Sequence, residues 1–170
     1  MKTHRVITII GWLVSGILLF LWQEKYLPFH YEYIEQFRLF HYSADYFIEH
    51  CSYPSGIIEY LGSFLIQFFN QPHVGAGIVT ILLLSVGIGI QQIFKRIASH
   101  VDMPLAYLLP TLFLLFAGMD INYHLEGTLA FALSVWFLNI QVSFVRPVHR
   151  MISGILLSWA LYYLAGPAFA

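Results

Sequence analysis

Charged residues are scarce in this sequence. Of its 170 residues only 10% are Asp, Glu, Lys or Arg, against about 25% in ordinary soluble domains, and 59% are hydrophobic. So few charges could not cover the surface of a soluble domain of this size. The shortage therefore excludes an ordinary soluble protein and predicts an integral membrane protein whose excess apolar surface meets lipid.

Other absences narrow the class further. The single cysteine, Cys51, excludes an internal disulfide, and a net charge of −1 gives no basic surface for nucleic acid. The phosphate-binding, dinucleotide-binding, serine-hydrolase and zinc-protease motifs of soluble enzymes do not occur. Asp120 and His124 have the loose spacing of a weak metal motif only. We therefore expect neither a cofactor nor a bound metal ion.

What the sequence does contain is a series of long apolar segments. A bilayer core of about 30 Å needs about 20 apolar residues, with about 17 as a lower limit. Five segments qualify or nearly qualify: 6–22, 74–94, 104–119, 128–145 and 151–170. No small-residue cleavage site follows the first, so we expect it to remain in the protein. Pro110 predicts a kink in the third. The fold class predicted is all-α: a single polytopic transmembrane domain with about five spans.

The basic residues are unevenly placed along these segments. Six of the eight lie before the first, after the second or after the fourth: Lys2, Arg5, Lys95, Arg96, Arg146 and Arg150. Every acidic residue except Asp102 lies near the opposite ends. Because short loops rich in Lys and Arg stay in the cytoplasm, the N-terminus is predicted to be cytoplasmic. Residues 23–71 and the loop near residue 120 are then predicted to face outward.

The long outer loop, residues 23–71, is predicted to hold helices that lie on the membrane surface. Pro28 can begin a helix, and Ser43 can cap a second one. A turn is expected at 53–56. The apolar helix expected at 57–69 carries one polar stripe, formed by Glu59, Ser63, Gln67 and Asn70. The many aromatic side chains of this loop suit either an interface belt or a recognition surface.

Carboxylates near lipid need water, a partner or a task, so they are the first candidates for a site. Glu35 in the first outer loop and Asp120 in the second are the candidate catalytic residues. Arg38, Glu59 and Gln67 are the candidate substrate-binding residues. Structural alternatives exist for both acids. Glu35 could pair with Arg38 on one helix face, and Asp120 could cap a helix end.

A stretch of this sequence resembles the N-terminal part of a family of uncharacterised bacterial multi-span membrane proteins. The resemblance rests on "EQFRLF…YF…YPSGIIEYLGSFLIQFFNQPHVGAG", Glu35 to Gly77, with a weaker likeness at Asp120 to Gly127. It implies a place in the bacterial inner membrane. Those proteins are longer, so we expect this sequence to be part of a longer chain.

The layout also resembles the GT-C class of glycosyltransferases: one span, a large outer loop with surface helices, two spans and a short acidic outer loop. The resemblance implies transfer of a sugar from a lipid-linked donor on the outer face, with Glu35 as base and Asp120 as its assistant. In that class the first position often holds an Asp or a paired acid, whereas this chain has Glu35 followed by Gln36. The alternative function is a non-catalytic membrane component, either an assembly partner or a transporter subunit.

Overall fold

The computed structural model describes residues 2–36, 39–97 and 107–166, without the side chains of residues 2–5. Within these ranges the chain is helical and contains no strand, as predicted. The elements are α1 (Lys2–Tyr26), α2 (Pro28–Gln36), α3 (Ala44–Cys51), α4 (Gly56–Ile66), the 3-10 helix η1 (Gln67–Asn70), α5 (Pro72–Ile97), α6 (Leu108–Ala117), α7 (Leu125–Ser143) and α8 (Pro147–Ala165).

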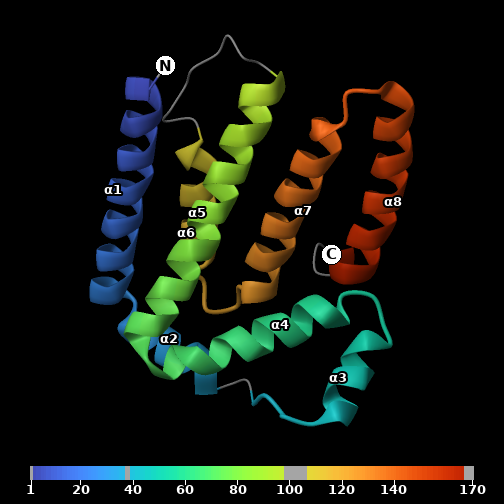
Figure 1. The fold of residues 1–170 in the computed structure, drawn as a ribbon. Helices are drawn as coiled ribbons and strands as arrows, with labels where there is room; N and C mark the ends of the chain where they lie inside the picture. The colour runs from blue at the N-terminus through green and yellow to red at the C-terminus, as the bar shows by residue number, and fades with distance from the viewer. Residues whose placement is uncertain (1, 37–38, 98–106, 167–170) are drawn as a thin grey trace.

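The helices form two parts (Figure 1). α1, α5, α6, α7 and α8 run side by side with alternating direction, and we call them the bundle. α2, α3, α4 and η1 lie across one end of the bundle, and we call them the end layer. Two hydrogen bonds fasten the end layer to α8: Ser55 N donates to Tyr163 O over 2.9 Å, and Tyr163 Oη donates to Cys51 O over 2.5 Å.

Three bundle helices are long and apolar enough to cross a membrane: Val6–Tyr26 within α1, Pro72–Ile97 and Leu125–Ser143. The other two differ. α6 has ten residues within the described ranges, about 15 Å at the rise of an α-helix. α8 has 19 residues, but His149 and Arg150 in its first turn lower its mean hydropathy. The chain therefore has the helices of a membrane protein, while the number of five spans stays a prediction.

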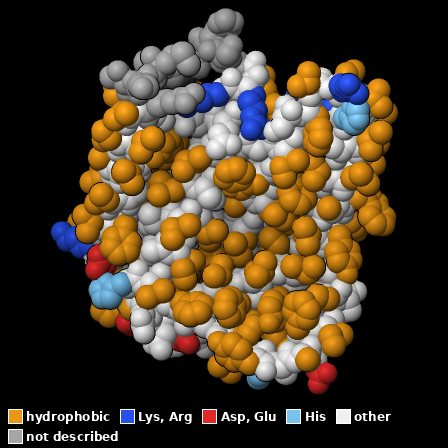
Figure 2. Space-filling view, in the orientation of Figure 1, with side chains coloured by type: hydrophobic (Ala, Val, Ile, Leu, Met, Phe, Trp, Pro, Cys, Tyr) orange, Lys and Arg blue, Asp and Glu red, His pale blue; other side chains and the backbone are white. Residues whose placement is uncertain are grey.

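Charges separate along the bundle axis. Lys95 and Arg96 end α5, and Arg146 and Arg150 flank the start of α8, so we call this the basic end. Glu24, Asp120 and Glu126 lie at the opposite, acidic end, together with the acids of the end layer and with Lys25 as the exception. Figure 2 shows this separation with a broad apolar band between the two ends. Such a pattern is typical of a protein whose middle lies in lipid.

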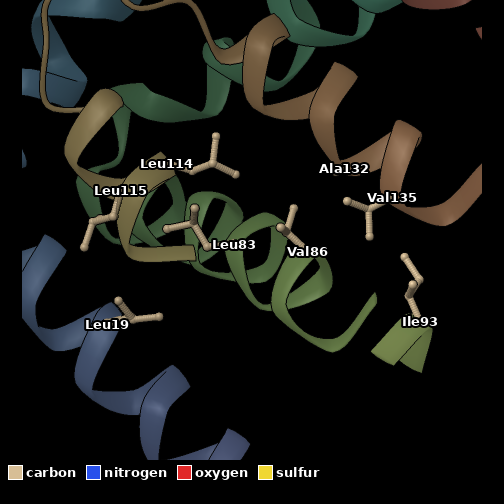
Figure 3. Close-up of a cluster of buried hydrophobic side chains, with 8 residues drawn as sticks. All are labelled: Leu19, Leu83, Val86, Ile93, Leu114, Leu115, Ala132 and Val135. Carbon is tan, nitrogen blue, oxygen red and sulfur yellow. The ribbon is translucent and has the colours of Figure 1, made fainter. Parts of the chain in front are cut away.

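Small residues let the bundle helices approach closely. Figure 3 shows the apolar centre, where eight buried side chains from α1, α5, α6 and α7 meet. A Cβ at Gly87 would lie 2.5 Å from the ring of Trp12, and one at Gly89 would lie 2.6 Å from Val135 Cγ1. Both contacts are shorter than real Cβ contacts. These glycines therefore allow close packing of α5 against α1 and α7.

A few buried polar side chains connect the bundle helices. Gln23 is fully buried, and its Nε2 donates to Thr80 Oγ1 over 2.8 Å. Trp12 Nε1 donates to Gln91 Oε1 over 3.0 Å, and Asn139 Nδ2 donates to Gly89 O over 2.7 Å. Each of these bonds joins α5 to a neighbouring helix. They fix the position of α5 where apolar contacts alone would allow sliding.

Local signals in the end layer correctly predict where its elements begin. α2 begins at Pro28, and Ser43 Oγ accepts the N–H of Tyr46 as the cap of α3. The turn at 53–56 is present, with Gly56 N donating to Tyr53 O over 3.2 Å. The apolar helix differs from the prediction for 57–69, because α4 ends at Ile66 and continues as the 3-10 helix η1.

The kink predicted at Pro110 is not required by the described part of α6. The helix begins at Leu108, which puts Pro110 in its first turn. The N–H groups of a first turn have no partner within their helix, so a proline there removes no hydrogen bond. The predicted segment 104–119 begins outside the described residues.

Candidate functional site

The acidic end contains a hollow of about 340 Å³ between α2 and the loop that joins α6 to α7. Its lining combines apolar and polar side chains from α2, α4, that loop and the start of α7: Tyr33, Ile34, Ile66, Ile121, Asn122, Tyr123, His124 and Leu125. We call it the end hollow. It is the place where the two segments selected from the sequence come together.

One wall of the end hollow is α2, which is held firmly by Tyr31. Its ring is buried and packs edge-on against Phe69, with centroids 5.0 Å apart. Its hydroxyl donates to Gln23 Oε1 over 2.5 Å, and burial raises the pKa of this phenol. Tyr33 and Ile34, which follow Tyr31 in α2, line the hollow. A buried, neutral tyrosine thus positions this wall.

A second bond ties α2 to the other wall. His30 Nε2 lies 2.8 Å from the carbonyl oxygen of Gly118, just beyond the end of α6. The two lie 88 positions apart in the sequence, so no local pattern could have predicted their contact. The bond connects α2 to the loop between α6 and α7, and His30, Gly118 and Tyr123 line one small cavity there.

The opposite wall is shaped by Asp120. Its Oδ1 accepts hydrogen bonds from the backbone N–H of Asn122 over 2.9 Å and from Asn122 Nδ2 over 3.2 Å. This is the local turn that aspartate commonly forms. Asp120 is exposed, and the turn directs the backbone at 121–122 along the hollow. Asp120 therefore holds a turn of the loop and is not the cap of a helix, since Gly118 ends α6 and His124 precedes α7.

The structure places Glu35 beside the end hollow without making it part of the lining. Glu35 is half-buried in the last turn of α2 and directly follows Ile34. The segments carrying Glu35 and Asp120 thus lie on two sides of one hollow, whose lining includes neither carboxylate. Arg38 lies outside the described residues, so its predicted pairing with Glu35 stays a prediction.

Glu59 lies elsewhere, at the start of α4. It accepts hydrogen bonds from Tyr53 Oη over 2.9 Å and from Ser55 Oγ over 2.5 Å. Burial, and next the bond to Glu59, raise the pKa of Tyr53 to about 12, so the phenol remains a donor at neutral pH. Ser55 has a φ of 74°, a left-handed conformation that is costly for a non-glycine residue. Glu59 stabilises this turn.

Gln67 is also held within the end layer. Its Oε1 accepts the hydroxyl of Tyr42 over 2.5 Å, and its Nε2 is buried without a hydrogen bond. Neither Glu59 nor Gln67 lines the end hollow. The two polar side chains of the predicted stripe therefore lie apart from the site that the other candidates surround.

Glu126 is 4% exposed and was not predicted from the sequence as a site residue. Among the acidic residues that the structure describes, it is the one buried carboxylate. It lies in the first turn of α7, where the helix dipole favours a negative charge. Gly62 of α4 makes room for it, because a Cβ there would lie 2.7 Å from Glu126 Cγ. The glycine inside an apolar helix is the one signal that pointed to this contact.

The aromatic side chains of the end layer divide into two groups. One group packs on itself over α3 and α4, with Phe40 at its centre. The rings within 6.0 Å of another member are Phe40, His41, Tyr42, Tyr46, Phe47, His50, Tyr53, Tyr60, Phe64 and Phe68. Tyr33 and Tyr123 line the end hollow instead. Most aromatic side chains of residues 23–71 therefore stabilise the end layer by packing on one another. Fewer of them are available to bind a ligand.

The described histidine, cysteine and acidic side chains are scattered. Within the described residues, His, Cys, Asp and Glu side chains form no group of three or more that could hold a metal ion. His73 Nδ1 lies 2.7 Å from Glu24 Oε1, but this pair has no third ligand.

Comparison with known proteins gives one match. The protein family described as "Family of unknown function (DUF6057)" matches residues 3–170. No curated protein and no solved structure matches the chain. The predicted likeness to an uncharacterised family is therefore confirmed, and it extends over nearly the whole chain instead of mainly Glu35 to Gly77.

Proposed function

We propose that this chain, which belongs to the DUF6057 family of unknown function, is a multi-pass protein of a bacterial inner membrane. In this proposal it binds the head of a lipid-linked sugar in its end hollow and transfers the sugar. Five membrane-crossing helices and a cytoplasmic N-terminus are part of the proposal. They rest on the separation of basic and acidic ends and on the rule that basic loops stay inside. The end hollow then lies at the outer face.

The observation that carries the proposal is the composition of the end hollow. Pockets for small ligands begin at about 300 Å³, so 340 Å³ suits a single sugar-sized head group. The aromatic rings of Tyr33 and Tyr123 offer faces for a sugar ring, and Asn122 offers an amide for its hydroxyls. The hollow also lies at the end of the bundle, where a lipid's head group leaves the apolar region.

Transfer would proceed by base catalysis. The oxygen of an acceptor hydroxyl attacks the anomeric carbon of the sugar, and the bond from that carbon to the donor phosphate breaks. The electron pair leaves with the phosphate, and Glu35 takes the proton of the acceptor hydroxyl. Asp120 contributes by holding Asn122 against the sugar. Glu35 is half-buried beside the hollow and outside its lining, so the acceptor hydroxyl would be bound at the edge of the hollow, next to Ile34.

A non-catalytic role is the second candidate, and one observation favours it. Asp120 and Glu59 are already engaged in local hydrogen bonds, and Gln67 is held by Tyr42. In that account the end layer is a docking surface for an assembly partner. A transporter subunit is disfavoured, because ionisable side chains are scarce in the apolar helices while transport pathways usually contain them.

The test is sugar transfer from a polyprenyl-phosphate-linked monosaccharide by the full-length protein in nanodiscs. We expect Glu35→Gln to lower the rate by about 100-fold or more, as loss of a general base commonly does. Glu32→Gln, on the exposed side of the same helix, is the control and should leave the rate unchanged.

Asp120→Asn should lower the rate less than Glu35→Gln, because asparagine can still accept the N–H of Asn122. Tyr33→Ala should weaken binding of the donor, measured separately by titration. If Glu35→Gln and Asp120→Asn both transfer at the full rate, the catalytic account fails. If Tyr33→Ala also binds the donor normally, the docking surface is the better account.

A further inference from the structure

A second hollow lies in the bundle and shares no lining residue with the end hollow. It has a volume of about 630 Å³ and runs between α1 and α5, which lie side by side in Figure 1. Its polar lining residues are Thr8, Thr80 and Gln91. The rest of the lining is apolar: Ile9, Trp12, Leu13, Gly16, Ile17, Phe20, Leu21, Leu84 and Ile88. We call it the side groove.

The side groove is long and narrow. On α1 its lining extends from Thr8 to Leu21, about 20 Å along the axis at the rise of an α-helix. Its length and its apolar lining suit one extended hydrocarbon chain.

The floor of the side groove depends on a glycine. Gly16 is buried, and a Cβ there would lie 2.8 Å from Leu84 Cδ1. Toward the basic end Trp12 Nε1 donates to Gln91 Oε1 over 3.0 Å, and the lining continues past this bond to Thr8, about one turn of α1 farther on. A chain in the groove would thus lie against Gly16 and Leu84, with its head-group end near Thr8.

A positive charge lies at this same end of the groove. The α5 residues of the lining include Leu84, Ile88 and Gln91, which recur at the spacing of one helix face. Lys95 continues the same face one turn farther on, in the last turn of α5, and its side chain is exposed. The groove therefore has a cationic group where the phosphate of a lipid would lie.

From this combination we propose that the side groove binds one acyl chain of an anionic phospholipid, whose phosphate lies at Lys95. Basic groups beside transmembrane helices are known to hold anionic lipid heads on the cytoplasmic side. The occupant differs from the lipid-linked sugar of the end hollow in its head group and lies at the opposite end of the bundle. The site would stand if the transferase function failed, because it shares no residue with the end hollow.

The test is retention of lipid by the purified full-length protein. Native mass spectrometry after extraction from bilayers of equal phosphatidylglycerol and phosphatidylcholine should show one phosphatidylglycerol bound selectively. Lys95→Gln should weaken its binding about fivefold, the effect of one Lys near an anionic head. Arg150→Gln removes another exposed charge of the basic end and should change nothing.

The groove itself is tested by a matched pair on α1. Ile17 lines the groove and is 58% exposed, whereas its neighbour Leu18 is 62% exposed and does not line it. Ile17→Trp should fill the groove and lower retention more than tenfold, while Leu18→Trp should retain the lipid normally. Equal retention by these two variants would overturn the proposal. So would equal retention of phosphatidylcholine, or a dimer of this chain that Ile17→Trp alone dissociates.

Discussion

The bundle and the end layer are held together in different ways. In the bundle, helices distant in sequence meet through shape: Gly89 admits Val135, and the buried Gln23 joins α1 to α5. In the end layer, many hydrogen bonds join residues close in sequence. Ser43 Oγ accepts the N–H of Tyr46, and Ser55 Oγ donates to Glu59. Bundle stability should therefore be sensitive to single atoms, whereas the end layer should tolerate changes that leave its local turns intact.

The largest difference should appear on adding one methyl group to a bundle glycine. In Gly89→Ala the new Cβ meets Val135 Cγ1 at 2.6 Å, and the stiff valine cannot turn away. We expect a loss of about 2–3 kcal/mol, measured by reversible unfolding in detergent.

Gly11→Ala is the matched control for this change. A Cβ at Gly11 has nothing within 4 Å, and alanine in a helix is more stable than glycine by about 0.5–1 kcal/mol. Gly11→Ala should therefore be neutral or stabilising. If the two variants unfold alike, the close approach of α5 and α7 is wrong.

The next difference concerns two tyrosine hydroxyls with similar bonds in different surroundings. Tyr31→Phe leaves the buried Gln23 Oε1 without its donor, which should cost about 1–3 kcal/mol. Tyr42→Phe removes an exposed bond to Gln67 and should cost less than about 0.5 kcal/mol. Urea unfolding of both variants measures the contrast, and equal losses would contradict it.

A smaller effect is expected where the two parts meet. Gly62→Ala brings a Cβ to 2.7 Å from Glu126 Cγ and should destabilise the contact of α4 with α7. In a background of Glu126→Ala that obstruction is gone, so the second change should cost about 1 kcal/mol less. Additive losses in this double-mutant cycle would mean that Gly62 does not make room for Glu126.

The smallest effect should be confined to α3. Ser43→Ala removes the cap bond to Tyr46 N and should destabilise this short, exposed helix by about 0.5 kcal/mol, the low end of the range for helix caps. Hydrogen exchange should rise at residues 46–50 and stay unchanged in α5. Faster exchange in both would show that the end layer and the bundle unfold as one unit.

The sequence predicted those features that depend on neighbouring residues. Pro28 and Ser43 mark helix starts because a proline or a cap acts within one turn. The role of Glu59 could also have been found, since Ser55 precedes it by one helical turn. The i to i+4 spacing of a serine and a glutamate at a helix start was the available signal.

What the sequence could not predict depends on distant contacts. Glu126 is buried only because α4 crosses the start of α7, and His30 reaches Gly118 only because α2 folds under α6. Composition and periodicity carry no information on either pairing. For the site, the structure brings α2 and the loop between α6 and α7 together around one hollow, but the residues that line it, Tyr33 and Asn122 among them, follow from packing.

The most direct test of the account is protection of the end hollow by its ligand. With Cys51→Ser as background, Ile121→Cys places a thiol in the hollow, and Asp45→Cys places one on the exposed face of α3. A membrane-impermeant maleimide applied from outside should label both, and a polyprenyl-phosphate-linked sugar should protect only the position at 121. Labelling at 121 that the lipid-linked sugar leaves unchanged, or that occurs only from the cytoplasmic side, would contradict the account.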